Sequence, residues 1–251
     1  MKARHERVNA LFVEFLGHLH TDLLRALDRE GVSYEPGIEV MEAALLFCTY
    51  ELRRIQPRCR QVFRSRELLA REIPPEIKEV IDSIAAKSVR GDDLGPHLSK
   101  RVREETMSKP DVLLHDWGIH HLHVGSNKPK EDGYVKNRRD LLFVMVRRDA
   151  LYMVDLRDHA AWEDDDLLEI VHCNWPETIA QFRTSIPAGE PIPPGERRLA
   201  RWRGLSMLTT RDGVVYAPPG GGQSTARTSA KAASDAHWMR QAANDEGQLG
   251  I

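Results

Sequence analysis

Residues 140–159 read DLLFVMVRRDALYMVDLRDH. Two runs rich in Val, Leu, Phe, Tyr and Met, residues 141–146 and 151–156, are joined there by Arg147-Arg148-Asp149. Apolar runs of this length with β-branched and aromatic residues are typical of strands, and so short a link favours antiparallel pairing. The stretch therefore predicts a pair of antiparallel strands at the centre of the fold.

The chain around this pair alternates between two textures. Helical spacing of apolar residues predicts helices at 8–27 and 74–84, and residues 40–52, which are apolar nearly all round, predict a helix buried among others. A closing helix is expected at 225–243, after the glycines at 220–222. Further strands are expected at 119–124, 205–209 and 214–217, the last two joined by the turn Asp212-Gly213. The sequence thus predicts an α+β fold in which an N-terminal helical region (1–108) precedes an α+β domain (109–251). That domain should hold a mainly antiparallel sheet of about five strands and a C-terminal helix.

The composition excludes several classes of protein. The 251 residues are 41% hydrophobic, and 36 Lys and Arg against 38 Asp and Glu give a net charge of −2, so net charge alone would not hold the protein to nucleic acid. No apolar run reaches membrane-span length and the first residues lack a signal-peptide core, so we expect a cytoplasmic protein without a membrane partner. Three widely spaced cysteines suggest neither a disulfide framework nor a Cys-rich zinc site.

Histidines gather in residues 114–125, which read LHDWGIHHLHVG. In a strand at 119–124, the period of two places His121 and His123 on one face and His120 on the other. Two neighbouring imidazoles suit general acid and base catalysis or metal binding. The alternative is a pair of hydrogen-bonded structural histidines near a sheet edge.

A second polar group follows the strand at 151–156. Plain alternation puts Asp155, Arg157 and His159 on the same face as Leu151 and Met153. Arginine can bind a phosphoryl group and stabilise developing negative charge, while Asp can hold a histidine in one tautomer. These are the parts of a phosphodiester cleavage site, and the alternative is a solvated face with an ion pair.

A metal site on these residues is a further hypothesis. His121 and His123 could join Asp155 or Asp116 in an arrangement of two histidines and one carboxylate. The sequence fixes no third ligand, and it lacks the motifs of zinc proteases, zinc fingers and EF-hands. We therefore expect no metal and no other cofactor, and a metal-dependent hydrolase is the third hypothesis for function.

Two arginine-rich segments are candidate nucleic-acid-binding surfaces. Their residues are Arg53, Arg54, Arg58, Arg60, Arg64 and Arg66 in the first, and Arg201 with Trp202 in the second. Arginines beside an aromatic ring suit single-stranded RNA or DNA through phosphate neutralisation and base stacking. A solvated helix face paired with nearby glutamates explains the first segment about as well.

A glycine-rich stretch, residues 218–225, precedes the closing helix and reads PPGGGQST. Backbone N–H groups at a helix start can cradle an anion, but the Gly-Lys-Ser/Thr of a phosphate-binding loop is missing. A flexible linker with a Ser or Thr cap is the favoured interpretation.

The order of helices, His-rich strand, DLLFVMV (140–146) and LYMVDLRDH (151–159) resembles the central sheet of RelE/ParE-type ribonuclease toxins over residues 111–160. The resemblance implies metal-free RNA cleavage, with Arg157 and His159 at strand-end catalytic positions and an antitoxin as protein partner. Residues 168–177 also resemble a segment of bacterial proteins without an assigned activity. The resulting prediction is an RNA-directed, metal-independent phosphodiesterase of bacterial toxin or defence type. The alternative is a non-catalytic protein-binding or nucleic-acid-binding module with structural histidines.

Overall fold

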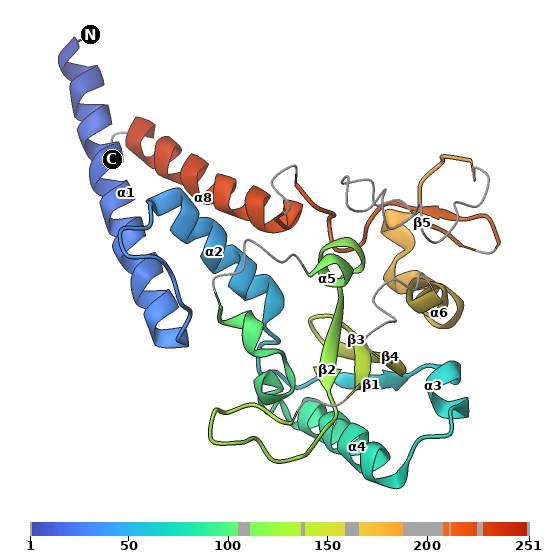
Figure 1. Cartoon of the computed structure of the whole chain (residues 1–251). Helices are drawn as coiled ribbons and strands as arrows, with labels where there is room; N and C mark the ends of the chain where they lie inside the picture. The colour runs from blue at the N-terminus through green and yellow to red at the C-terminus, as the bar shows by residue number, and fades with distance from the viewer. Residues whose placement is uncertain are drawn as a thin grey trace.

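The structure is a computed structural model that describes residues 2–104, 111–136, 139–158, 166–187, 208–210, 212–224 and 228–249, without the side chains of 2–12, 208–209 and 243–249. It confirms the α+β fold, with helices at the N-terminus and at the C-terminal end. Figure 1 shows the long first helix and the last helix together, away from the sheet. No helix among the described residues is long and apolar enough to cross a membrane.

Four strands form the main sheet in the order β1-β4-β3-β2. They are β1 (Gln61–Arg64), β2 (Ile119–His123), β3 (Asp140–Val146) and β4 (Ala150–Asp158). The central pair β3 and β4 is antiparallel as predicted, and β2 adds to it antiparallel. The first strand was not predicted. It pairs with β4 in parallel, as the register of Phe63 against Tyr152 shows, and so makes the sheet mixed.

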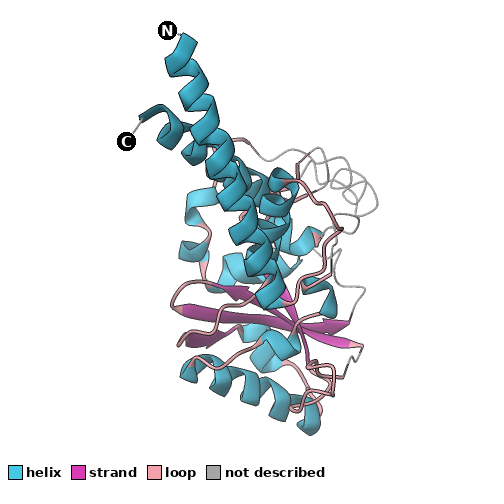
Figure 2. Ribbon diagram, turned by 90° about the vertical axis from the view of Figure 1, so that its left-hand side faces the viewer, coloured by secondary structure: helices cyan, strands magenta, loops and turns pink. Residues whose placement is uncertain are grey.

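Helices cover both faces of this sheet, which lies as a layer between them in Figure 2. On one face α4 (Pro75–Arg90) buries its apolar stripe, Ile77, Val80, Ile81 and Ile84, against the strands. On the other face α5 (Val112–Trp117) and α6 (Asp166–Asn174) pack around Phe143. Because both faces are covered, the central strands are apolar throughout, which explains their continuous hydrophobic runs.

A β-bulge divides β4 into two halves. The register pairs Phe143 with Asp155 but Val144 with Met153, so Val154 is the extra residue. Directly opposite residues of an antiparallel pair point to the same face. The bulge therefore reverses the in-and-out alternation that plain counting would give beyond Val154.

The reversal corrects one sequence prediction. Leu151 and Met153 pack in the core under α4. Asp155 lies opposite Phe143 and Arg157 opposite Leu141, and both of these partners belong to the core under α6. The expectation that these four residues share one face is wrong, because the bulge at Val154 separates the first two from the last two. The sequence pattern did not indicate this bulge.

The helical layer joins both ends of the chain. The first helix, α1 (Lys2–Glu30), packs with α2 (Val40–Arg53), and α8 (Ala230–Leu249) contacts both of them. Their shared core includes Leu27, Ala44 and Ala236. Since β1 also precedes residue 108, the chain on either side of the predicted boundary at 108/109 shares both the sheet and the helical layer.

The remaining described elements are short. A separate two-stranded sheet pairs β5 (Leu208–Thr209) with β6 (Val215–Tyr216), so the two last predicted strands exist but do not join the main sheet. A short helix and four 3₁₀ turns complete the description: α3 (Arg66–Ala70), η1 (Gly95–His97), η2 (Lys100–Val102), η4 (Pro176–Thr178) and η5 (Ala180–Phe182).

Candidate functional site

The predicted histidine pair is present on β2. The rings of His121 and His123 lie 6.0 Å apart between centroids, at 84° to each other, and both side chains are buried. A carboxylate oxygen of Asp111 lies 3.7 Å from His121 Nδ1. The other oxygen of Asp111 accepts the backbone N–H of Leu114 at 3.1 Å, which caps α5 and fixes the carboxylate beside the histidine.

Two further buried histidines lie close to this pair in the chain, His115 on α5 and His120 on β2. Burial is the main cause that lowers the pKa of His115 to about 4, against a raising effect of Asp111. The pKa of His120, on the other face of β2, is also lowered to about 4. Burial is the main cause, and Arg60 and Arg147 contribute in the same direction. Both imidazoles are therefore neutral near pH 7.

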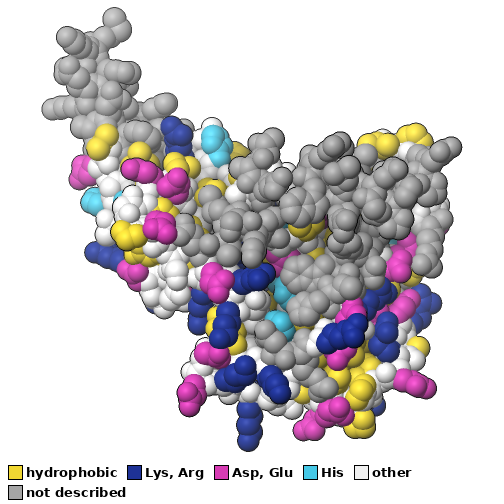
Figure 3. Space-filling model, in the orientation of Figure 1, with side chains coloured by type: hydrophobic (Ala, Val, Ile, Leu, Met, Phe, Trp, Pro, Cys, Tyr) yellow, Lys and Arg dark blue, Asp and Glu magenta, His cyan; other side chains and the backbone are white. Residues whose placement is uncertain are grey.

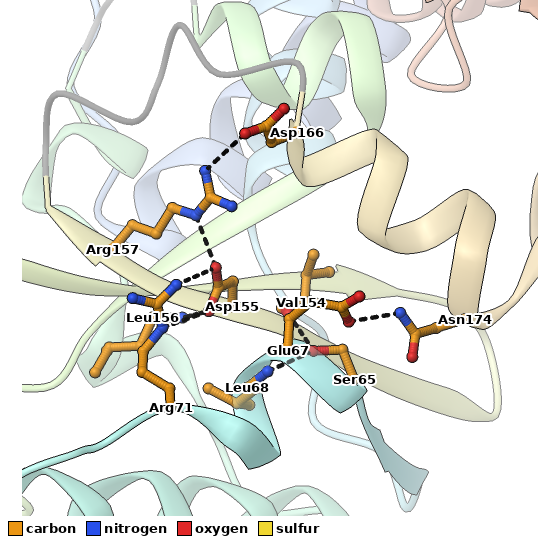
Figure 4. A network of polar contacts seen from close by, with 10 residues as sticks. All are labelled: Ser65, Glu67, Leu68, Arg71, Val154, Asp155, Leu156, Arg157, Asp166 and Asn174. Carbon is orange, nitrogen blue, oxygen red and sulfur yellow. Dashed lines mark hydrogen bonds and ion pairs between the residues drawn. The ribbon is translucent and has the colours of Figure 1, made fainter. Parts of the chain in front are cut away.

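The second predicted group, Asp155 and Arg157, belongs to a buried ion-pair network (Figure 4). The carboxylate of Asp155 is fully buried and accepts two hydrogen bonds from Arg71, at 2.9 and 2.7 Å. Arg157 Nε donates to the same carboxylate at 2.7 Å, and its Nη1 lies 3.9 Å from Asp166. The network ties α3 and the start of α6 to β4, which is a structural task.

The sheet places the histidine pair and this network on one face but not side by side. His121, Phe143 and Asp155 lie in one row across three strands. His123, Leu141 and Arg157 lie in the next row. Because β3 lies between, each histidine is two strand spacings, about 9.5 Å, from β4. His159, the remaining member of the predicted catalytic set, lies outside the described residues.

The metal hypothesis gains nothing from this arrangement. Within the described ranges, no three His, Cys, Asp or Glu side chains gather closely enough to hold a metal ion. Asp155, one proposed third ligand, is held by two guanidinium groups instead. The other, Asp116, lies buried on α5.

The arginines of residues 53–66 do not form one surface. Arg53 is buried and donates to the backbone carbonyl of Arg101 at 3.5 Å. Arg64 pairs with Asp82 at 2.7 Å, and Arg66 contacts the end of α6 through Asn174 and Cys173. Their side chains are used to hold elements together.

The other three arginines of the segment, Arg54, Arg58 and Arg60, line a single pocket of about 730 Å³. Cations from distant parts of the chain join them there: Arg147 and Arg148 from the β3–β4 turn and Lys231 from α8. We call this set of six side chains and its cavity the basic pocket. Two carboxylates also line it, Glu51 and Asp235, and His120 lies in its wall.

Two guanidinium groups of the basic pocket are bound only by neutral groups. Arg60 Nε donates to the carbonyl of Arg147 at 3.0 Å and its Nη1 to the carbonyl of Arg58 at 3.3 Å. Arg147 donates to the carbonyls of Val146 and Thr178, both at 3.4 Å. In the part of the chain that the structure describes, no carboxylate contacts either guanidinium. Burial is the main cause that lowers the pKa of both; for Arg60 the neighbouring Arg58 acts in the same direction and Asp149 opposes it.

On the face of the molecule shown in Figure 3, positively and negatively charged side chains are interspersed. Because six cations gather in the basic pocket while charges of both signs are mixed on the face in Figure 3, a chain of net charge −2 can still carry a basic site. Sequence reasoning missed Arg147, Arg148 and Lys231 as candidates. One signal for Arg147 and Arg148 was present in the sequence: two arginines stand in the tight turn directly after a buried strand, and a tight turn does not by itself need arginine.

The glycine-rich stretch does not cradle an anion with its backbone. The N–H groups of Gly220 and Gly222 donate to carbonyls at the end of α5, those of Asp116 and His115, at 2.9 and 2.8 Å. A Cβ at Gly220 would lie 2.3 Å from the Leu114 carbonyl oxygen, so the stretch needs glycine for close packing on α5. The second arginine-rich candidate, Arg201 with Trp202, lies outside the described residues.

Comparisons with known proteins add no family to this description: no family model, no curated protein and no solved structure matches the chain.

Proposed function

We propose that this protein binds single-stranded nucleic acid through the basic pocket. The observation that carries the proposal is the environment of the buried Arg60 and the partly buried Arg147. Both guanidinium groups donate to carbonyls, and no carboxylate of the described residues contacts them. A phosphate would supply the missing counterion and accept bidentate hydrogen bonds. The pocket thus favours a ligand with phosphate groups.

The outer part of the pocket favours a polyanion over a single phosphate. Arg58 and Arg148 are exposed and extend the positive charge from the buried pair towards solvent. Lys231 is held by Asp235 at 2.8 Å on the same helix. A backbone with successive phosphates could contact the inner and the outer arginines together, which one small anion could not do.

The test is the salt dependence of binding to a short labelled RNA and to DNA of the same sequence. With several phosphates neutralised, log K should fall linearly with log salt at about −0.7 per phosphate. The variant Arg58→Glu/Arg148→Glu should lose at least tenfold in affinity because two exposed charges are reversed. Arg139→Glu is the matched control, since Arg139 is exposed and precedes β3 at the end opposite to Arg147.

The result decides the proposal in either direction. A steep salt dependence that is lost in the double variant and kept in the control supports it. Binding that is absent, independent of salt or equal in all three proteins would exclude the basic pocket as a nucleic-acid site.

RNA cleavage, the activity expected from the sequence, is a second candidate. The observation that favours it is the imidazole pair His121 and His123 with Asp111 at 3.7 Å from the first ring. One neutral imidazole would take the proton of a 2′-hydroxyl while its oxygen bonds to phosphorus. The other, protonated, would give its proton to the departing 5′-oxygen, which leaves a 2′,3′-cyclic phosphate and a free 5′-hydroxyl.

Among the described residues, few charged side chains near the histidine pair are available to stabilise the negative charge that develops in this cleavage step. Arg157 is already paired with Asp155 and lies one strand beyond β3, so its charge is compensated. A toxin-type role with an antitoxin partner belongs to this second candidate and depends on its activity.

Cleavage of the labelled RNA should be assayed in EDTA for the wild type, His121→Ala and His123→Ala. If the pair is catalytic, each variant should lose about 10²- to 10⁴-fold in rate, and chelation should have no effect. A wild type that binds RNA and leaves it intact excludes this candidate while the binding proposal stands.

A further inference from the structure

We infer that a second pocket, adjoining the basic pocket, is a subsite for a nucleobase of the bound strand. This inference rests on the proposed function, because the phosphates of the same strand would lie in the basic pocket. The pocket has a volume of about 440 Å³, and its polar and aromatic lining includes Glu30, Tyr50, Asp93, Arg103 and Tyr134. We call it the tyrosine pocket.

The two pockets meet at one arginine. Arg54 lines both, as does the adjacent Ile55. Its guanidinium lies 2.9 Å from Glu51 in the basic pocket and 3.3 Å from Glu30 in the tyrosine pocket. A nucleotide chain that crosses this boundary could leave its phosphates on one side and a base on the other.

Charge separates the roles of the two pockets. The basic pocket has six cationic side chains against two carboxylates, whereas in the tyrosine pocket Arg54 and Arg103 are matched by Glu30 and Asp93. A phosphate therefore gains more in the basic pocket. Carboxylates suit the N–H donors of a base edge, as in the pairing of acidic side chains with the amino group of cytosine.

The aromatic wall is held in position by its backbone. The N–H of Tyr134 donates to Asp132 at 3.0 Å, and its carbonyl accepts the N–H of Lys130 at 2.8 Å. The next residue, Val135, donates to the carbonyl of Pro96 at 2.9 Å, which fastens the loop to η1. The backbone that carries the half-buried Tyr134 ring is thus held in place, and the ring can serve as a platform for base stacking.

Cation–π contacts complete the platform. The Arg103 guanidinium lies 5.9 Å from the centre of the Tyr134 ring, and that of Arg54 lies 5.4 Å from the centre of the Tyr50 ring. Tyr50 is buried and donates through its hydroxyl to Glu30 at 2.7 Å, so it forms the inner wall. Of the two rings, Tyr134 is the one that a base can reach.

The experiment compares an eight-nucleotide RNA with an abasic oligomer of the same length and charge. The wild type should bind the RNA at least fivefold more tightly, because stacking of one base contributes a gain of that order. Tyr134→Leu should remove this preference and leave the affinity for the abasic oligomer unchanged. Tyr134→Phe is the matched control and should keep the preference, since it retains the ring.

The outcomes separate this inference from the proposal on which it rests. Equal affinity of the wild type for RNA and abasic oligomer, with a steep salt dependence, overturns the base subsite and leaves the basic pocket as a phosphate site. A preference for RNA that survives in Tyr134→Leu places the base elsewhere and overturns the inference as well. Failure to bind either oligomer excludes the proposed function itself.

Discussion

The basic pocket and the network around Asp155 use the same side chain in opposite ways. In the network, Arg71 and Arg157 share one fully buried carboxylate at 2.7–2.9 Å. In the basic pocket, the partners of Arg60 and Arg147 among the described residues are backbone carbonyls. Both regions lie at ends of β4. In the network both arginines contact a carboxylate, whereas in the basic pocket Arg54 and Lys231 do and Arg60 and Arg147 do not contact any carboxylate of the described residues.

The difference shows which arginines stabilise the fold through ion pairs and which keep their charge available for a ligand. A guanidinium with a buried carboxylate partner fixes one element against another, and removal of either partner leaves the other charge in a poor environment. A guanidinium with carbonyl partners is oriented but keeps its charge, so an anion from outside can still gain from it. Substitutions in the two regions should therefore differ in their effects on stability and on binding.

The largest effect concerns the carboxylate of the network. Asp155→Ala removes the buried carboxylate that Arg71 and Arg157 share and should lower the free energy of unfolding by about 2–4 kcal/mol. This is at the lower side of the range for a broken buried pair, because the Arg71 side chain is 39% exposed. Urea denaturation measures it, with Arg139→Ala at the exposed pair with Asp158 as the control. A loss no larger than the control's would show that the network is not structural.

The second effect is a loss of stability in acid through His120. Its pKa of about 4 in the folded protein lies below the ordinary 6.5, so the unfolded chain binds a proton more readily between these values. The contribution to stability is therefore complete above pH 6.5 and falls by about 1.4 kcal/mol per pH unit towards pH 4. Burial is the main cause, His121, Arg60 and Arg147 act in the same direction, and Asp111 opposes them.

The measurement is urea denaturation at pH 7 and pH 5. The wild type should lose about 2 kcal/mol more than His120→Gln between these values. His237→Gln, a change at an exposed position of α8, is the control and should behave as the wild type does. Equal losses in wild type and His120→Gln would contradict a neutral, buried His120 beside the arginines of the pocket.

The third prediction removes one arginine from each region. Arg147→Met removes a partly buried charge that no carboxylate of the described residues contacts, so the free energy of unfolding should stay the same or rise by up to about 1 kcal/mol. Arg157→Met takes a charged hydrogen bond from Asp155 and should lower it by about 1–2 kcal/mol. RNA affinity should fall in the first variant and not in the second. If both variants lose the same stability, the two regions do not differ in the way proposed.

Much of the fold was predictable from the sequence because it depends on local pattern. The runs at 141–146 and 151–156 are apolar enough to be central strands, α2 is apolar nearly all round as a buried helix is, and α4 shows helical spacing directly. β1 was missed because Gln61–Arg64 lies among arginines and becomes a strand by pairing with β4. Strand formation of that kind is set by neighbours and not by propensity.

The candidate site shows the same division. The shared face of His121 and His123 follows from the period of two along one strand, and the sequence predicted it. The partner of Asp155 could not be predicted, since Arg71 lies 84 residues away. The basic pocket was equally hidden, because its cations come from the segment between α2 and β1, the β3–β4 turn and α8. Only the three-dimensional fold brings such residues together.

The smallest effect compares two arginines of one segment, Arg58 and Arg64. Arg58 lines the basic pocket, and no carboxylate of the described residues lies within ion-pair distance of it, whereas Arg64 is held by Asp82 at 2.7 Å. If Arg58 neutralises one phosphate, Arg58→Gln should reduce the slope of log K against log salt by about 0.7, the share of one released counterion. Arg64→Gln, which removes the same charge six residues later, should leave the slope unchanged because that guanidinium serves the fold. Titration of the short RNA at four salt concentrations resolves the two slopes. An equal reduction in both variants would mean that net charge, and not the arrangement of the basic pocket, attracts the nucleic acid.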